Sequence, residues 1–119
     1  MIKEMQDAQN RDEKRRFERI DISSSAQIAV LDENGGRVGT LRQLARGGFA
    51  MEPETSYSKD NKVHNFTIHE PAEDIRVEVS ARVRFAEESL VGFEFVDLTA
   101  DSAVDVGVII GKYYEHNKA

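Results

Sequence analysis

The stretch "IRVEVSARVRFA", residues 75–86, decides the fold class of this chain. Every second residue is apolar, from Ile75 through Val83 to Phe85, and mostly charged residues fill the positions between them. Because successive side chains of a β-strand point to opposite faces, this alternation predicts one face in a core and one face in water. We therefore expect a long antiparallel strand, with Phe85 turned inward beside Val83.

Five further segments on either side of this strand carry weaker versions of the same pattern. They cover residues 26–32, 37–45, 46–53, 62–70 and 90–97. Asn34 and Gly35, between the first two, tolerate the positive φ angles of a tight hairpin turn, and Pro53 ends the third. Six antiparallel strands with short turns and one apolar face close most simply into a small barrel.

The C-terminal segment changes its apolar period from two residues to that of a helix. Its apolar residues are spaced at i, i+3, i+4 and i+7: Val106, Ile109, Ile110 and Tyr113. This spacing predicts a helix over about residues 101–116 that covers one open side of the barrel. We expect Gly107 and Gly111 to allow close packing of the helix on the barrel. The predicted fold class is mainly β, a small six-stranded antiparallel β-barrel with a C-terminal α-helix.

Length and composition restrict the possible settings of the protein. The chain of 119 residues is long enough for one domain, which we place at residues 15–119 after a flexible polar tail at 1–14. It has no cysteine, which excludes disulfides and thiolate metal sites. No apolar run approaches the ~20 residues of a membrane span, and the N-terminus has no apolar signal region, so we expect a cytoplasmic protein. A net charge of -6 argues against DNA or RNA as a partner.

The sequence contains no pattern typical of an enzyme or a metalloprotein. His64, His69 and His116 lack neighbours at metal-ligand spacing, and ordinary structural roles account for them better. The serines at 23–25 have neither the strand before them nor the helix after them that a nucleophile elbow requires. We predict that the protein is not an enzyme and uses no metal or cofactor.

The most unusual local feature is the basic stretch "DEKRRFERID", residues 12–21, in an acidic chain. It places Lys14, Arg15, Arg16 and Arg19 within six residues. Arginine presents a planar fork of donors that matches phosphate and the O6/N7 edge of guanine, and its flat face stacks on purines. The stretch by itself is compatible with a solvated linker and with a site for an anion.

The stretch "RRFERI" resembles the RxxxR element, here Arg15 and Arg19, that opens PilZ domains just before their first barrel strand. The stretch "QLARGG" resembles their second element, (D/N)xSxxG, with Gly48 as its last glycine. The resemblance extends through "VGFEFVDLT" and the C-terminal helix. It implies a PilZ-like, split-barrel fold and a receptor for the bacterial second messenger cyclic di-GMP.

The resemblance also implies the ligand-binding residues. They are Arg15, Arg16, Arg19, Gln43, Ala45 and Gly48, of which Arg15 and Arg19 clamp the phosphates and contact the guanines. Gln43 stands where Asp or Asn is expected, and Ala45 stands where Ser is expected. One amide oxygen replaces only part of a carboxylate's contact with guanine, and a methyl group replaces nothing of a hydroxyl's. Losing both contacts costs on the order of 2–4 kcal/mol.

Two functions remain open at this point. The first is a stand-alone receptor that binds cyclic di-GMP through its N-terminal arginine loop and relays the bound state to a partner protein. The second is a divergent PilZ-like module that binds proteins and no nucleotide. In either case we expect a monomer or a weak dimer, an unidentified effector protein as partner, and no membrane span.

Overall fold

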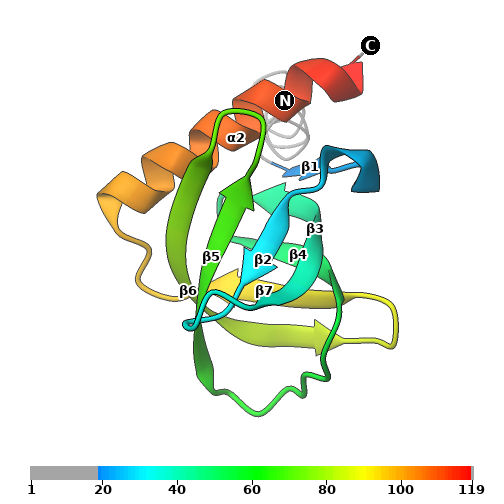
Figure 1. Ribbon diagram of the computed structural model, residues 1–119. Helices are drawn as coiled ribbons and strands as arrows, with labels where there is room; N and C mark the ends of the chain where they lie inside the picture. Colours follow the sequence, from blue (N-terminus) through cyan, green and yellow to red (C-terminus); the bar gives the residue numbers. More distant parts are fainter. Residues whose placement is uncertain (1–18, 119) are drawn as a thin grey trace, which may run out of the picture.

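The computed structural model describes residues 19–118, which form seven strands, one short 3-10 helix and one long helix (Figure 1). The strands are β1 (Arg19–Asp21), β2 (Ala29–Leu31), β3 (Arg37–Ala45), β4 (Gly48–Pro53), β5 (Val63–Glu70), β6 (Ile75–Ala86) and β7 (Val91–Phe95). The 3-10 helix η1 covers Ser24–Ala26, and α2 covers Ala100–Lys118. Arg15, Arg16 and the predicted tail at 1–14 lie outside the described residues.

Six of the strands form a closed antiparallel barrel. Their order is β3-β2-β5-β6-β7-β4, and the pairing of β4 with β3 closes the ring. The extra strand β1, which the sequence patterns did not predict, continues the line of β2 along the same edge of β3. It pairs Arg19 with Ala45 and Asp21 with Gln43. The predicted fold class, a six-stranded barrel with a C-terminal helix, is confirmed.

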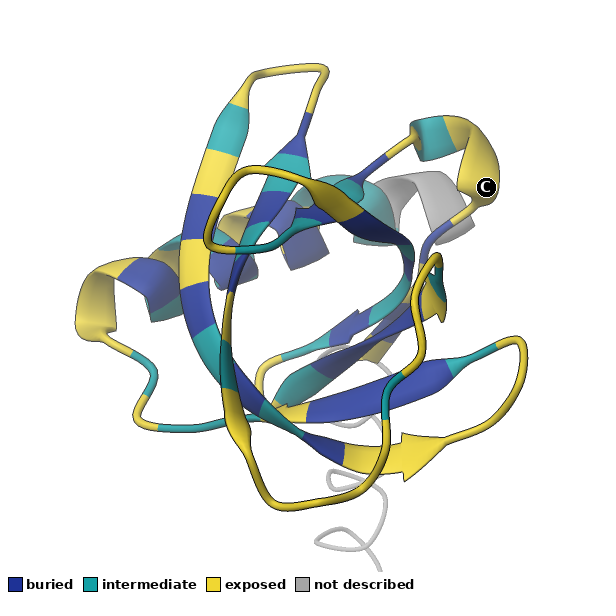
Figure 2. Ribbon diagram, turned by 60° about the horizontal axis from the view of Figure 1, so that its bottom comes forward, coloured by how far each residue is buried: buried dark blue, intermediate teal, exposed yellow. Residues whose placement is uncertain are grey.

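The barrel encloses an apolar core, and helix α2 lies across one end of it. Figure 2 looks in from the opposite end and shows buried and exposed residues alternating along β6. The rings of Phe49, Phe66 and Phe93 meet inside, with centroids 4.9–5.8 Å apart. On α2, Ile109 and Ile110 are almost fully buried against the barrel. Apolar burial of this extent is the main source of stability in a domain of this size.

A buried carboxylate ties α2 to the turn between β5 and β6. Glu70 has no solvent exposure, and it accepts hydrogen bonds from Lys112 on the helix and from the backbone N–H groups of Ala72 and Glu73. Burial works to raise the pKa of Glu70, but Lys112 and these two N–H groups together hold the pKa below its ordinary value. The charged form of Glu70 is therefore the form that supports the fold.

The outer face of α2 corrects one expectation. A Cβ atom added at Gly111 would find no atom within 4 Å, and one added at Gly107 would meet only Arg46, at 3.9 Å. The expected close packing of these glycines on the barrel is therefore wrong. The same side of the helix exposes Val104 and Val108, whereas Val106 faces the barrel. No helix in the described part of the chain is long and apolar enough to cross a bilayer.

A β-bulge in β6 corrects the predicted direction of Phe85. Val83 pairs with Phe93 of β7, but the next pair is Phe85 with Gly92, so Arg84 is an extra residue in β6. An extra residue reverses the alternation of the side chains that follow it. Phe85 consequently leaves the inward row of Val83 and is 39% exposed on the outside of the barrel. The periodic sequence pattern contained no sign of this interruption.

Candidate functional site

Four of the residues singled out from the sequence line one hollow on the outside of the barrel. The hollow has a volume of about 460 Å³ and crosses β1, β3, β4, β7 and β6. We call it the arginine hollow. Its outward-facing lining consists of Arg19, Gln43, Ala45, Gly48, Ala50, Arg84, Phe85, Gly92 and Glu94. Arg19, Gln43, Ala45 and Gly48 were expected to bind one ligand, and they lie together here.

Strand register explains why this part of the surface is hollow. Ala45 pairs with Gly48, and Ala50 pairs with Gly92, so four small residues lie next to one another on β3, β4 and β7. Cross-strand partners share one face of a sheet, and long side chains stand at both ends of this floor. Arg19 continues the row on one side of Ala45, and Phe85 continues it beyond Gly92.

The charge on the arginine hollow differs from that of the surrounding surface. Most arginines of residues 19–118 face carboxylates: Arg37 with Glu54, Arg42 with Glu52, Arg76 with Asp74 and Arg82 with Glu94. Arg46 also has an interaction partner. Among the arginines of the described residues, only the side chains of Arg19 and Arg84 have neither an ion pair nor a hydrogen bond, and both line the hollow. Two such guanidinium groups favour an anion.

Gln43 has a carboxylate neighbour that the sequence analysis missed. Its side-chain nitrogen donates to Oδ1 of Asp21, 3.2 Å away, because Asp21 is its partner in the β1–β3 pair. The side-chain oxygen of Gln43 remains as a hydrogen-bond acceptor for a ligand. Asp21 adds a negative charge beside Gln43, and Gln43 is the position at which the PilZ motif has an Asp or Asn. Only the pairing of the unpredicted strand β1 with β3 brings these residues together.

Gly48 is required by the barrel itself. A Cβ atom at this position would lie 2.1 Å from the carbonyl oxygen of Phe93 on β7, whereas one at the adjacent Gly47 would meet nothing within 4 Å. The close approach of β4 and β7 therefore explains this glycine without reference to a ligand.

Arg42, the neighbour of Gln43 on β3, does not line the hollow. It is the extra residue of a bulge in β3, and it bonds Glu52 and the carbonyl oxygen of Ile22. The residues of the hollow that sequence reasoning missed are Ala50, Arg84, Phe85, Gly92 and Glu94. Finding them requires the strand register, because no motif links β6 and β7 to β3.

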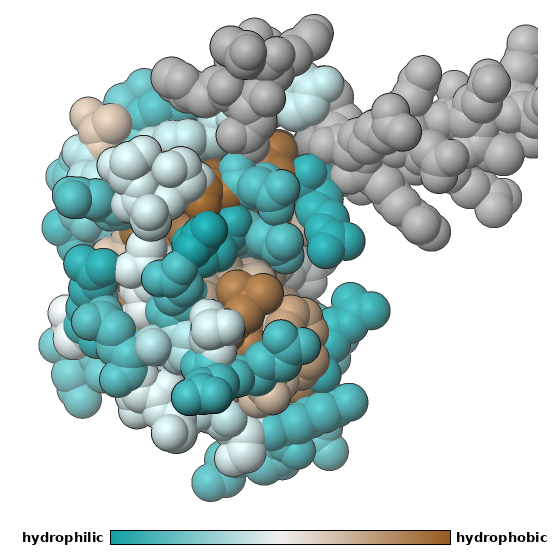
Figure 3. All heavy atoms as spheres, turned by 90° about the vertical axis from the view of Figure 1, so that its right-hand side faces the viewer, coloured by the Kyte–Doolittle hydropathy of each residue, from teal (hydrophilic) through white to brown (hydrophobic). Residues whose placement is uncertain are grey.

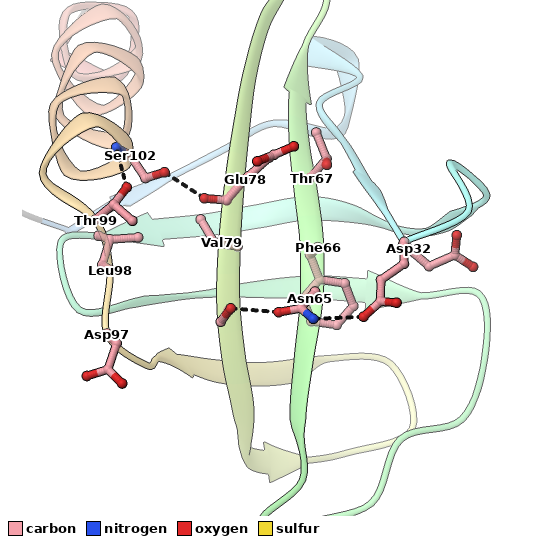
Figure 4. Close-up of a pocket in the computed structure, with 12 residues that line it drawn as sticks. Asp32, Asn65, Phe66, Thr67, Glu78, Val79, Asp97, Leu98, Thr99 and Ser102 are labelled. Carbon is pink, nitrogen blue, oxygen red and sulfur yellow. Dashed lines mark hydrogen bonds between the residues drawn. The ribbon is translucent and has the colours of Figure 1, made fainter.

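A second hollow of about 430 Å³ lies across the outside of β5 and β6 (Figure 4). Four carboxylates line it, those of Asp32, Glu33, Glu78 and Asp97, and we call it the acidic hollow. Its lining contains no lysine or arginine. Figure 4 shows Asp97 and Leu98 on one side of the two strands and Asp32 on the other.

The polar groups of the acidic hollow largely bond one another. Asn65 donates to Glu33 over 2.7 Å and accepts from the hydroxyl of Ser80 over 2.6 Å. Ser102 donates to the carbonyl oxygen of Glu78 over 2.7 Å. Among the side chains that the structure describes, residues 19–114, no three His, Asp or Glu groups are arranged to hold a metal ion.

The sequence profile of one family, the PilZ domain, matches residues 13–110. The chain belongs to this family. Its fold is also similar to that of solved PilZ proteins. The PilZ domain of CeSA from a cellulose-synthesizing bacterium has a TM-score of 0.57 at 18% identity, over 79% of this chain and 95% of that one.

Two further solved structures have the same fold. The PilZ domain of YcgR from Escherichia coli, determined with c-di-GMP, has a TM-score of 0.58 at 12% identity, over 84% of this chain and 91% of that one. MotI/DgrA, an inhibitor of motility from Bacillus subtilis, has a TM-score of 0.64 at 19% identity, over 86% of this chain and 51% of that one. No curated protein matches this PilZ domain in sequence.

Proposed function

We propose that this PilZ domain is a receptor for cyclic di-GMP and that the arginine hollow holds the nucleotide. The observation that carries the proposal is the pair Arg19 and Arg84, which line one hollow and have no partner among the described residues. Cyclic di-GMP offers two phosphates and two guanines, and a guanidinium group can bind either. The PilZ domain of YcgR, which has the same fold, was solved with this nucleotide.

The RxxxR element supplies the phosphate contacts in this proposal. Arg19 binds from β1, at the rim of the hollow, and Arg15 and Arg16 close over the ligand from the segment before it. Two phosphates and several guanidinium groups make the strongest contacts of the complex, because hydrogen bonds between charged groups are about twice as strong as neutral ones.

The modified second element retains part of its guanine recognition. Gln43 supplies an amide oxygen, and Asp21 beside it supplies a carboxylate that can accept from guanine N–H groups. Ala45 supplies neither donor nor acceptor, and its half-buried methyl group forms part of the floor. We therefore expect a weaker receptor than one with both motif residues.

The output in this proposal is a contact with a partner protein. In this proposal, binding brings Arg15 and Arg16 against the barrel, and the ligand covers the positively charged arginine hollow. A partner protein can recognise the changed surface. This is a receptor function, with no chemical step.

Isothermal titration with cyclic di-GMP tests the proposal, with cyclic di-AMP as the control for guanine recognition. We expect saturable heat with the guanine nucleotide and at least tenfold weaker binding of the adenine nucleotide. A dissociation constant of about 1 mM corresponds to a binding free energy of roughly -4 kcal/mol. Absence of heat at ligand concentrations up to that value would favour the alternative, a PilZ module that binds only proteins.

A further inference from the structure

The bulge in β6 places an aromatic ring in the arginine hollow. Phe85 follows the extra residue Arg84, pairs with Gly92 and lines the hollow with 39% of its surface exposed. Without the extra residue, Phe85 would continue the buried row of Val83. Bulges next to binding sites commonly redirect a side chain in this way.

The contact between Phe85 and Gly92 defines how the ring lies. A Cβ atom at Gly92 would be 2.2 Å from Cε1 of Phe85, 2.6 Å from Cζ and 2.7 Å from Cδ1. One edge of the ring therefore lies over the glycine backbone. Gly92 is required for this placement, because any larger residue would push the ring away from the strand.

A purely structural role for Phe85 is to cover this glycine. That role leaves its exposure unexplained, since the other phenylalanines of the barrel strands are buried or half-buried in one aromatic cluster. It also leaves unexplained why the ring lies in the hollow that contains the two arginines without partners, one of which, Arg84, is the bulge residue itself.

We infer that Phe85 is a stacking platform for a purine base of the bound nucleotide. The inference rests on the proposed function and adds a base contact outside both sequence elements. Every purine has an apolar face that stacks on an aromatic ring. Stacking requires no hydrogen bond, so it can offset contacts that Gln43 and Ala45 no longer make. Arg84 lies next to the ring in sequence and adds a positive charge for the phosphate edge of the ligand.

The absence of tryptophan from the chain allows a direct test. Phe85→Trp introduces a single indole at the platform, and Val104→Trp introduces one on the outer face of α2, where the residue is 64% exposed. On titration with cyclic di-GMP we expect strong quenching of the indole at 85 and none at 104, because a stacked purine quenches indole fluorescence.

Titration calorimetry of three further variants separates stacking from proximity. Phe85→Leu keeps an apolar side chain but removes the aromatic face, and we expect roughly 5- to 100-fold weaker binding. Phe85→Tyr keeps the face and should bind within about threefold of wild type. Gly92→Ala keeps the ring of Phe85 but displaces it, so this substitution should also weaken binding, as Phe85→Leu does.

The results distinguish this inference from the proposed function. Heat with the wild-type chain, together with unchanged affinity in Phe85→Leu, overturns the stacking platform alone, whether or not the indole at 85 is quenched. No heat with the wild-type chain and no quenching at 85 overturns the proposed function and the platform together. If Phe85→Trp does not fold, as judged by circular dichroism, the affinities of Phe85→Leu and Phe85→Tyr decide the question.

Discussion

The two hollows on this barrel have nearly the same volume and opposite chemistry. The arginine hollow has Arg19 and Arg84, without partners in the described chain, against one carboxylate, Glu94. The acidic hollow has four carboxylates and no basic residue. Glu33 accepts from Asn65 and Asp32 accepts from its own turn, whereas the carboxylates of Glu78 and Asp97 have no ion pair within the described residues. Volume therefore does not identify a binding site here. The sign of the unpaired charge distinguishes the two hollows, because guanidinium groups attract an anion and carboxylates repel one.

The two hollows also differ in how they are built. The floor of the arginine hollow consists of small residues on paired strands, so its shape depends on the register of the barrel. The acidic hollow lies between a hairpin turn and the start of α2 (Figure 4). The side of the molecule seen in Figure 3 is mainly hydrophilic, with small hydrophobic patches. Five predictions test these differences, from the largest expected effect to the smallest.

The largest effect is expected from the floor of the arginine hollow. Gly48→Ala places a methyl group 2.1 Å from the backbone oxygen of Phe93, so β4 and β7 must separate. We expect a loss of at least about 3 kcal/mol in unfolding free energy, measured by urea denaturation. Gly47→Ala is the matched control and should change stability by less than about 0.5 kcal/mol, because its Cβ meets nothing. Equal losses in both variants would show that strand separation is not the cause.

The second prediction concerns the unpaired arginine at the rim. Arg19→Ala should weaken cyclic di-GMP binding roughly 10- to 150-fold, because it removes a charge-assisted contact. Arg37→Ala removes an arginine that pairs with Glu54 outside the hollow, and should leave the affinity within about twofold. Titration calorimetry measures both. Equal effects of the two substitutions would mean that overall charge, and not the hollow, determines binding.

The third prediction concerns helix α2, whose first turn lines the acidic hollow. Glu70→Gln removes the charged carboxylate that accepts hydrogen bonds from Lys112 and from two backbone N–H groups. The unfolding free energy should fall by about 1.5–3 kcal/mol at neutral pH. Because the folded state lowers the pKa of Glu70, its contribution is present above the ordinary glutamate pKa and is lost as the pH falls through the folded value.

Thermal unfolding between pH 7 and pH 3 measures this difference. The gap in stability between wild type and Glu70→Gln should narrow as the pH falls. A constant gap over the whole range would exclude Glu70 ionisation as its source.

The fourth prediction restores the second sequence element. The double substitution Gln43→Asn, Ala45→Ser adds a hydroxyl and keeps a neutral amide opposite Asp21, and should tighten cyclic di-GMP binding about fivefold. Gln43→Asp should do worse, because it places a second carboxylate directly across from Asp21. Calorimetry that finds no gain from the double substitution would contradict the assignment of Gln43 and Ala45 to the nucleotide site.

The smallest effect is expected at the acidic hollow. Asp97→Asn and Glu78→Gln remove charge from its lining and should change nucleotide affinity by less than about twofold at 0.15 M salt. A strengthening above tenfold in titration calorimetry would show that the acidic hollow influences the nucleotide site, and the two hollows would then not be independent.

Sequence reasoning reached the fold because local pattern and global architecture agree. The alternation in residues 75–86 and the helical spacing after residue 101 each describe a face that must be buried, and a barrel with a covering helix buries both. The RxxxR spacing likewise predicted that Arg19 belongs to a binding site, and the second element predicted the same of Gln43, Ala45 and Gly48. All four line the arginine hollow, and their part in binding stays a prediction.

The sequence by itself determined the six barrel strands and the C-terminal helix, but not β1, because side-chain periodicity is a local property of the chain. It also identified the arginine element, because that spacing is local. Only the tertiary structure decided which strands are neighbours, and therefore that Asp21 lies beside Gln43 and that Phe85 and Arg84 line the same hollow as Arg19. A bulge adds one residue to one strand relative to its partner, so it exists only once the two are paired. Periodicity within β6 alone therefore predicted an inward Phe85, and pairing with β7 turned it outward.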